Sequence, residues 1–456
     1  MIVCCGEALI DMVRIKTSTS EEVFLPLPGG SPYNTAIAIG RLNVPVTFLG
    51  RFSSDFFGEI LIKRLRANRV GDELIKRAVQ NTSLAFVKLE KGKEPRYVFY
   101  TEGTANCSLS MEDLPPALPP ETRCILFGSI AMTVEPIASS IEALILREGA
   151  RKSADQMDGA PVLSFDPNIR SFLITDHNAY LRRFEKWIAA STIAKISSSD
   201  FKFLYPGLQP EQALQKVIAM GPRLAICTLA TKGALALLRR NDGSVTRVSV
   251  PGISLPVVDT IGAGDAFHGA LLAWLEMKGK MSRSALVNLS EADLYNALLF
   301  ANKAAAIVCS RRGAEPPTRK EIQSLNVPEG KAAANKPTVK KAVPEKPKVG
   351  KPAAKKATNG KPKASKPAAK KATTKTAAAA PMKKSAAAKP AAAAPTKKSA
   401  AAQTTASAPA RKTAVAKTAA SAPARKTAAT KTTASAPAKK SAAKTVVKKP
   451  AVKKRG

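Results

Sequence analysis

The stretch DTIGAGDAF, residues 259–267, places two glycines and an acid directly before an apolar helix pattern. Residues 266–277 (AFHGALLAWLEM) have the apolar spacing of a helix, and the apolar run 253–258 ahead of the stretch is interpreted as a strand. Backbone N–H groups at a helix N-terminus lack intrahelical partners, and the helix dipole favours negative charge there. Gly262 and Gly264 would let a phosphate approach that backbone closely. The stretch therefore predicts an anion site at the start of a helix.

Asp265 ends this glycine-rich stretch, and its role depends on what the helix start binds. An anion is a poor phosphate ligand, so a carboxylate here is better suited to take a proton from a nucleophile that attacks the phosphate. From the spacing alone, a tight turn capped by Asp265 explains the same residues equally well.

A second glycine segment, LPGGSPYNTAIAIGRL at residues 27–42, also precedes an apolar helix pattern. Gly29 and Gly30 suit close backbone approach to a polar ligand, and Asn34 supplies a donor and an acceptor. An ordinary helix start is the alternative, because the run lacks the Gly-Lys-Ser/Thr of a Walker motif. Alone, this segment is weak evidence for a site.

The chain has 456 residues and a formal net charge of +38, which is concentrated at one end. Residues 331–456 contain 34 Lys and Arg against one acid, Glu345, and no Phe, Tyr, Trp, His or Cys. SAPARKTA occurs there twice, at 407–414 and 421–428. Such a segment cannot bury enough apolar surface to offset its ordering entropy, so it is predicted to be a disordered basic tail.

Residues 1–330 alternate short apolar runs with helix patterns, which predicts an α/β domain with a mostly parallel sheet flanked by helices. In such folds ligands bind outside the carboxyl ends of the strands. The segments 12–27 and 84–105 contain strands without intervening helices, and they are predicted to form a small antiparallel lid over the site. The candidate site positions expected to follow strand ends are Asp11, Gly128, Asp166, Asn168 and Asp265.

Other features restrict the class of protein. No apolar run reaches the ~18 residues of a membrane span, and Glu7 and Asp11 interrupt the N-terminal apolar residues, which argues against a signal peptide. The six cysteines lack Cys-x-x-Cys spacing, and two histidines are too few for most zinc sites. Reduced, buried cysteines and a cytoplasmic location are therefore expected.

The two glycine segments together resemble the two signatures of the ribokinase-like (PfkB) sugar kinases, in the expected order and separation. The resemblance runs from the first strand to SRRGAEPPTR, residues 310–319. Within the family, GEALIDM, FGSIAM, DPNIR and YVFYTEGTA are most similar to bacterial fructokinases. The resemblance implies a ribokinase-like fold and ATP-dependent, Mg²⁺-assisted phosphorylation of a sugar primary hydroxyl, with fructose as the expected substrate.

The resemblance also implies a role for each matching residue. Asp265 matches the catalytic base, and Gly262, Ala263 and Gly264 match the anion hole for the transferring phosphoryl group. The positions implied to bind the sugar or phosphate are Asp11, Gly30, Asn34, Asp166, Asn168 and Arg170. The positions implied to bind the nucleotide are Thr228, Gly233 and Asn302. Asp259 resembles part of a monovalent-cation loop, which implies a K⁺ dependence, and family dimers pair through the lid.

Two positions depart from the family pattern. The Asn-x-x-Glu segment associated with Mg²⁺ is replaced by residues 197–200, SSSD, and Asp200 is one methylene shorter than Glu. Asp200 is retained as the Mg²⁺ candidate, directly or through water. Ala230 replaces a glycine of the nucleotide loop, and its methyl group matters only if the backbone φ there is positive.

Alternative functions stay open at this point. A kinase for 2-keto-3-deoxygluconate, another small sugar or a nucleoside would carry the same signatures, because lid residues decide the substrate. A different class is a sequence-independent nucleic-acid-binding protein whose tail is the functional part and whose body is a vestigial scaffold. The tail resembles those of linker histones and bacterial histone-like proteins, and its cations attract any polyanion, which predicts nucleoid association within the cytoplasm. A solubilising appendage with no partner is the alternative for the tail.

Overall fold

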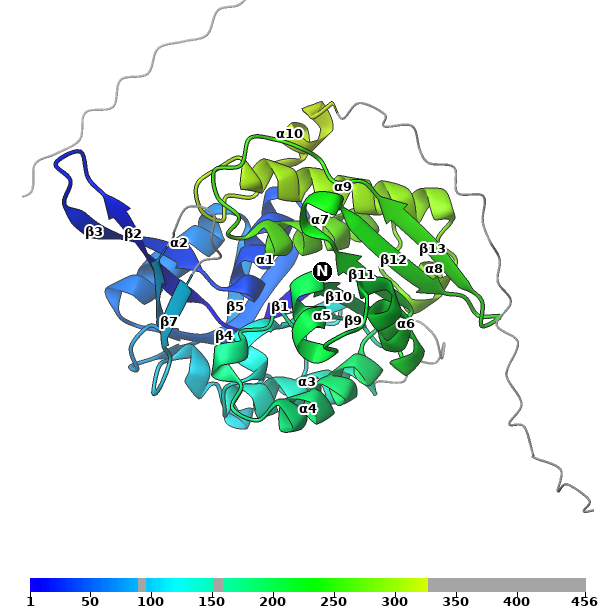
Figure 1. Cartoon of the computed structure of the whole chain (residues 1–456). Helices are drawn as coiled ribbons and strands as arrows, with labels where there is room; N and C mark the ends of the chain where they lie inside the picture. The colour runs from blue at the N-terminus through cyan, green and yellow to red at the C-terminus, as the bar shows by residue number, and fades with distance from the viewer. Residues whose placement is uncertain (89–95, 151–158, 327–456) are drawn as a thin grey trace, which may run out of the picture. The chain divides into compact units, whose positions relative to one another are not determined.

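The computed structural model describes residues 1–88, 96–150 and 159–326 (Figure 1). These residues all belong to one compact unit. The predicted basic tail and the predicted boundary after residue 330 lie outside the described residues.

A nine-stranded sheet forms the centre of this unit. Seven strands, from β5 to β11 in space, pair in parallel, and two further strands pair antiparallel at the far edge. The mostly parallel sheet expected from the alternating pattern is confirmed, and the antiparallel edge is an addition to it. In spatial order the strands are β13 (Val245–Val250), β12 (Ala234–Arg239), β11 (Leu224–Thr228), β10 (Ile193–Ser197), β9 (Val162–Asp166), β8 (Cys124–Gly128), β1 (Ile2–Cys5), β4 (Val46–Ser53) and β5 (Val70–Ala78).

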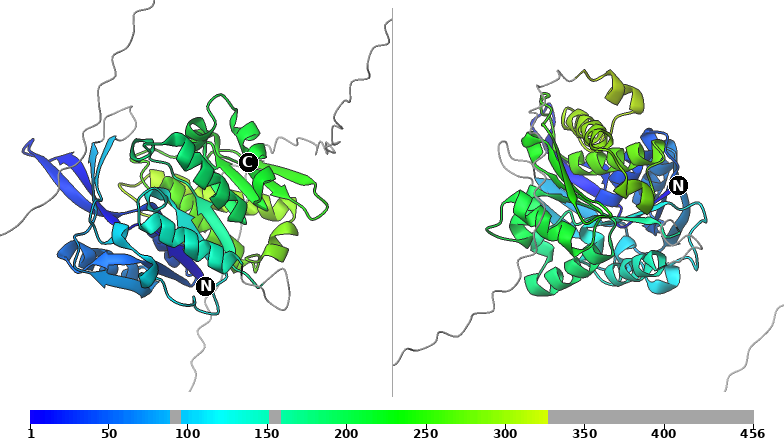
Figure 2. Two further views of the ribbon diagram at one scale, coloured as in Figure 1. Left: turned by 90° about the horizontal axis from the view of Figure 1, so that it is seen from below. Right: turned by 90° about the vertical axis from the view of Figure 1, so that its right-hand side faces the viewer.

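Helices cover both faces of this sheet (Figures 1 and 2). Successive residues of a strand point to opposite faces, so Ile2 and Cys4 of β1 pack in one apolar core and Val3 and Cys5 pack in the other. The first core contains residues of α1 (Ser31–Arg41), α2 (Phe56–Ala67), α7 (Ala263–Met277), α8 (Arg283–Val287), α9 (Glu291–Cys309) and α10 (Arg319–Ser324). The second contains residues of α3 (Ile137–Gly149), α4 (His177–Ala190), α5 (Ser198–Leu204) and α6 (Pro210–Met220).

A second, smaller sheet confirms the predicted lid. Its order is β3 (Glu22–Gly29), β2 (Leu9–Lys16), β6 (Leu84–Lys88) and β7 (Arg96–Tyr100), and the β2–β3 hairpin projects from the body in Figure 1. The two hairpins are antiparallel, whereas the β2–β6 pair that joins them is parallel. The connection between β6 and β7, residues 89–95, lies outside the described residues. Asp11, expected after a strand end, lies within β2, because the chain passes from β1 almost directly into the lid.

The connection before α7 also differs from the prediction. Residues 251–262 contain no strand, although the apolar run at 253–258 suggests one. Pro251 and Pro256 lack the backbone N–H that a strand needs, and Val257 and Val258 are 66% and 64% exposed. The acid of the glycine stretch therefore follows a loop rather than a strand end.

The described residues form no disulfide bond. Among the described residues, no helix is long and apolar enough to cross a membrane. All six cysteines carry free thiols; five are buried and Cys309 is half-buried. Burial raises the pKa of the Cys4 thiol well above its usual range, so this thiol stays protonated and unreactive.

Candidate active site

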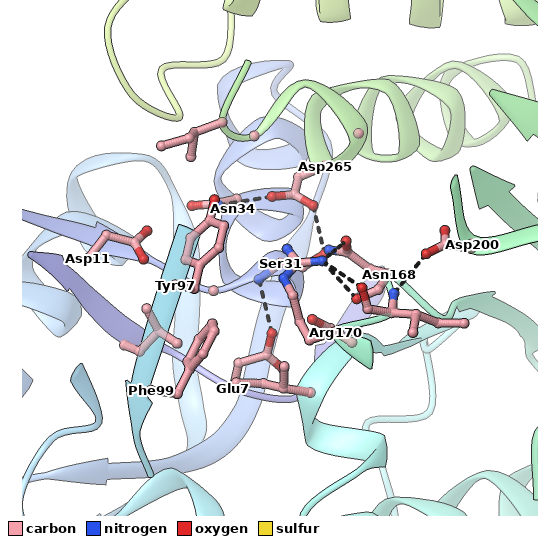
Figure 3. A pocket seen from close by; sticks show the side chains of 18 of the residues that line it. Glu7, Asp11, Ser31, Asn34, Tyr97, Phe99, Asn168, Arg170, Asp200 and Asp265 are labelled. Atoms are coloured by element: carbon pink, nitrogen blue, oxygen red, sulfur yellow. Dashed lines mark hydrogen bonds between the residues drawn. The ribbon is translucent and has the colours of Figure 1, made fainter. Parts of the chain in front are cut away.

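A cavity of about 600 Å³ lies where the lid, the start of α1 and the start of α7 meet (Figure 3). Residues that follow β8, β9 and β10 also line it, so it occupies the carboxyl-end edge of the large sheet, as expected for a ligand site in a parallel α/β fold. The predicted site residues that it brings together are Asp11, Gly30, Asn34, Asn168, Arg170, Asp200, Gly262, Gly264 and Asp265.

The start of α7 faces this cavity through Gly262 and Gly264. Gly262 is the N-cap residue with a φ of 78°, and a Cβ there would lie 2.5 Å from the Cβ of Ala314, so both backbone and space require glycine. Ala263 does not line the cavity, and its N–H donates to the Thr260 carbonyl at 3.3 Å. The first turn of α7 is therefore open to an anion chiefly through its two glycines.

Asp265 lies in that first turn, and hydrogen bonds from α1 hold both of its carboxylate oxygens (Figure 3). The Ser31 hydroxyl donates to Oδ1 at 2.6 Å, and the Asn34 amide donates to Oδ2 at 2.9 Å. Burial raises the pKa of Asp265 above its ordinary value, and these two hydrogen bonds oppose the rise because they stabilise the ionised form. The arrangement suits a group that accepts a proton inside the cavity.

A second buried carboxylate, Glu7, fixes the start of α1. Its Oε1 accepts the Ser31 N–H at 3.1 Å, and its Oε2 accepts the Ala131 N–H at 3.2 Å. Gly30, the N-cap residue of α1, has a φ of 108°, and a Cβ there would lie 2.6 Å from the Glu7 carbonyl oxygen. Burial raises the pKa of Glu7 to about 7. Gly30 thus allows the start of α1 to pack directly on the backbone of Glu7 and Ala8, which brings this turn to the cavity.

The lid and a facing loop give the cavity a wall of mixed polarity. Burial raises the pKa of Asp11 to about 7, and the Arg170 guanidinium opposes that rise. The same guanidinium lies 5.7 Å from the centre of the Tyr97 ring, over its face. Phe99 stacks on Phe172 with ring centres 5.6 Å apart. Aromatic surface with a few fixed polar groups is the usual lining of a small-molecule site.

The DPNIR segment divides between the cavity and the layer behind it. Arg170 Nη1 donates to Asn168 Oδ1 at 2.7 Å, and both residues line the cavity. Asp166, predicted to contact the ligand, is buried outside the cavity, and its Oδ2 accepts a hydrogen bond from the Lys195 ammonium at 2.7 Å. Burial alone would raise the pKa of Asp166, but Lys195 holds it below its usual range. Lys195 Nζ lies 3.2 Å from where a Gly264 Cβ would be, so this ion pair supports the anion site from behind.

The carboxylates at the two predicted metal positions are already engaged by backbone N–H groups. Asp200 accepts the Ile169 N–H on Oδ1 at 2.8 Å and the Ser197 N–H on Oδ2 at 2.9 Å, while Asp259 Oδ2 accepts the Gly313 N–H at 2.9 Å. No cluster of three or more His, Cys, Asp and Glu side chains in the described ranges is placed to hold a metal ion. Mg²⁺ keeps several water ligands and binds substrate phosphates, so Asp200, which lines the cavity, fits a contact through water rather than a protein cage.

The predicted nucleotide positions lie apart from this cavity, around the turn between β11 and β12. Thr228 ends β11, and Gly233, with a φ of 95°, has no room for a Cβ, which would lie 2.1 Å from the Val250 carbonyl oxygen. The Asn302 amide of α9 donates to the Pro251 carbonyl at 2.9 Å. The fold therefore brings Gly233 and Asn302 to the same short segment after β13.

Ala230, the residue that departs from the family glycine, lies in this turn. Its φ is 51°, in the left-handed region. A side chain there costs roughly 1–2 kcal/mol relative to glycine. The backbone of Ala230 is therefore strained. The positive φ is the condition stated above for the methyl group to affect the nucleotide loop.

A mostly parallel sheet with a separate lid, and a glycine-rich helix start at their junction, together define a ribokinase-like sugar kinase. The chain belongs to the pfkB family of carbohydrate kinases, whose pattern matches residues 1–321. It is 36% identical over 298 residues to the fructokinase of Rhizobium leguminosarum bv. trifolii. The aligned region covers 65% of this chain and 86% of that protein.

Two solved structures give the same result. The fructokinase of Xylella fastidiosa with bound ATP has a TM-score of 0.62, and the fructokinase of Vibrio cholerae O395 in its fructose-, ADP- and calcium-bound form has a TM-score of 0.60. Each is 26% identical and covers 71% of this chain and 97% of its own. The expected family, fold and enzyme class are confirmed.

Several residues of the site escape the sequence patterns. Ser31 and Glu7 lie in the quoted segments SPYN and GEAL, but only the fold shows that their polar groups meet. Tyr97 and Phe99 alternate on β7, which signals a strand and not a wall of the cavity. Lys195 interrupts an apolar strand, and a buried lysine in that position is the one signal that a carboxylate partner lies nearby.

Proposed function

We propose that the protein transfers the γ-phosphoryl group of ATP to the primary hydroxyl of a sugar, with fructose as the substrate. The observation that carries this proposal is the placement of Asp265, a buried carboxylate in the cavity, within the glycine-rich first turn of α7. The choice of fructose is supported by the fructokinase relatives, one of which binds fructose and ADP.

In this mechanism Asp265 takes the proton of the sugar hydroxyl as its oxygen attacks the γ-phosphorus. The bond from the γ-phosphorus to the bridging oxygen breaks, and ADP leaves. Backbone N–H groups of Gly262 and Gly264 would hold the transferring phosphoryl oxygens, whose charge the α7 dipole also favours. Asp11, Asn34 and Arg170 line the same cavity and would orient the sugar hydroxyls, while the lid excludes water.

Metal ions have defined places in this proposal. Mg²⁺, when bound with the nucleotide, neutralises charge on the phosphate oxygens. Asp200 would hold it through water, since both of its oxygens already accept backbone hydrogen bonds. Asp259, whose carboxylate ties its loop to Gly313, is the proposed K⁺ position.

The proposal is tested by assaying the purified full chain with ATP and a panel of acceptors. ADP release is measured with fructose, 2-keto-3-deoxygluconate, ribose and adenosine, and the product is checked for phosphate on the primary hydroxyl. We expect the highest kcat/KM with fructose. A much higher kcat/KM with any other acceptor would replace fructose as the substrate, and no turnover with any of them would favour the nucleic-acid-binding alternative.

A further inference from the structure

We propose that Ser31 is a positioning residue of the phosphoryl transfer, and that it determines which oxygen of Asp265 receives the proton. Glu7 completes the device by fixing the backbone of Ser31. This inference deepens the proposed function and rests on Asp265 being the base. The sequence resemblance assigns no role to either Ser31 or Glu7.

Ser31 contacts two carboxylates through two different groups. Its hydroxyl donates to Asp265 Oδ1 at 2.6 Å, and its backbone N–H donates to Glu7 Oε1 at 3.1 Å. The residue is 9% exposed and lines the cavity, so its hydroxyl lies where the substrate would meet Asp265 (Figure 3). Ser31 thus links Asp265, the proposed base, to Glu7, a carboxylate buried in the fold.

The two donors on Asp265 are not equivalent when that carboxylate gains a proton. The Asn34 amide nitrogen carries hydrogens only and can donate to Oδ2 but not accept from it. The Ser31 hydroxyl can rotate and accept a hydrogen bond from a protonated Oδ1. The proton of the sugar hydroxyl is therefore accepted by Oδ1. When it arrives, the Ser31 hydroxyl changes from hydrogen-bond donor to acceptor, while the Asn34 amide continues to donate to Oδ2.

Glu7 gives this arrangement its rigidity. Its carboxylate is 1% exposed and accepts the first N–H of α1 and the Ala131 N–H, which lies in the turn Ser129–Met132 after β8. The Glu7 carboxylate therefore fixes the positions of two segments that line the cavity, the start of α1 and the turn after β8. Because Glu7 fixes the backbone of Ser31, it also fixes the position of the Ser31 hydroxyl.

Three charged groups on other elements interact with Asp265, namely Asp11 on β2, Asp166 on β9 and Lys195 on β10, while Glu7, Arg170 and Asp200 line the same cavity. None of them is bonded to Asp265, whereas Ser31 and Asn34 are. Removing the Ser31 hydroxyl leaves all three in place. A change in the titration of Asp265 in such a variant therefore reports the lost hydrogen bond.

The test compares Ser31→Ala, Ser31→Thr and Thr35→Ala in the full chain. The kcat for fructose and its pH dependence at saturating substrates are measured for each variant, because kcat/KM would also report Asp11, whose pKa is raised to about 7. Ser31→Ala should move the acid limb upward by about one pH unit and lower kcat about tenfold, because the ionised form of Asp265 loses a donor. Ser31→Thr should restore both values, since it keeps a hydroxyl. Thr35, whose hydroxyl bonds the Ser31 carbonyl at 2.9 Å, controls for loss of a buried hydrogen bond in the same turn, and its alanine variant should move neither value.

A second variant tests the anchor. Glu7→Gln offers one acceptor to two backbone donors, so kcat should fall while the KM for ATP stays within about twofold. An unchanged acid limb in Ser31→Ala, or an equal shift in Thr35→Ala, would overturn the role of Ser31, and an unchanged kcat in Glu7→Gln would overturn the role of the anchor. The proposed function is tested separately. If Asp265→Asn retains its turnover, the assignment of Asp265 as the base is wrong. If Asp265→Asn loses turnover but Ser31→Ala changes neither kcat nor the acid limb, only the present inference fails.

Discussion

The side-chain amide of Asn34 donates a 2.9 Å hydrogen bond to the Asp265 carboxylate, although 231 residues separate the two in the chain. Each residue belongs to one of the two glycine segments, and each lies in the first turn of its helix, α1 or α7. The contact shows that the two segments form one site. It also means that the proposed base is oriented by the turn that lines the sugar side of the cavity.

Asp11→Asn should make the protein more stable and less active. The pKa of Asp11 is about 7 in the folded protein against an ordinary value near 3.8, so the folded state holds the proton more tightly. The stability contributed by this carboxyl is complete below the ordinary pKa and is lost as pH rises through about 7. We expect Tm to rise by about 2–4 °C at pH 8 and to change little at pH 5.

The same variant should lose about 10–100-fold in kcat/KM for the sugar, because a charged acceptor for hydroxyl groups is removed. Thermal unfolding at both pH values and the kinase assay check the two effects. Asp242→Asn is the matched control, since hydrogen bonds from Ser244 hold the pKa of this exposed carboxyl below its ordinary value. A gain in Tm at pH 8 in the control as well would show that the effect is not specific to the site.

Ala230→Gly should relieve strain in the turn between β11 and β12. The φ of 51° costs a side chain roughly 1–2 kcal/mol, and the greater freedom of glycine in the unfolded chain takes back about 0.4–1 kcal/mol. A rise of about 1–3 °C in Tm is expected. Ala236→Gly in the buried part of β12 should instead lower Tm, and a lower Tm for Ala230→Gly would contradict the assignment of strain.

Alternation of apolar runs and helix patterns predicts the parallel sheet because buried parallel strands are continuously apolar. Two strands of the parallel part, β5 and β10, lack such a continuous apolar run. The sequence VGDELIKRA of β5 is rich in charge because β5 is an edge strand, and IAKIS of β10 contains Lys195, which is buried only because Asp166 neutralises it. The run at 253–258 misleads in the opposite direction, since Val257 and Val258 are exposed and the segment forms no strand.

The site is predicted where a residue type follows from a local requirement. Glycine is required at position 262 because its φ is 78° and a Cβ there would lie 2.5 Å from the Cβ of Ala314. Asp265 is then a candidate catalytic group as the acid beside it. Local pattern cannot show that Asp166 lies behind the anion site, because this depends on the pairing of β9 with β10. It equally cannot show which hydroxyl reaches Asp265, because Ser31 lies 234 residues away in the chain.

The basic segment 331–456 is proposed to bind nucleic acid without regard to sequence. Its 34 cations and single acid would release counterions from any polyanion, and it has no aromatic side chain to stack on bases. Binding of duplex DNA by the full chain should fall steeply between about 50 and 200 mM salt. This is measured beside kinase activity for the full chain and for a chain ending at Gly330. Equal DNA binding by the two proteins would contradict the proposal, and localisation at the nucleoid would be expected only for the full chain.

The chain ending at Gly330 should keep full kinase activity, because all the site residues named above precede that position. Loss of activity on truncation would show that the two parts of the chain depend on one another.

The most direct test of the account is the turnover of Asp265→Asn with fructose and ATP. Asparagine keeps the shape of the side chain but cannot accept the proton, so kcat should fall by about 10²–10⁴-fold. The Tm and the affinity for ATP should stay close to those of the unmodified protein, which shows that the loss is chemical. Turnover within a few-fold of the unmodified protein would contradict the assignment of Asp265 as the base and, with it, the mechanism built on the start of α7.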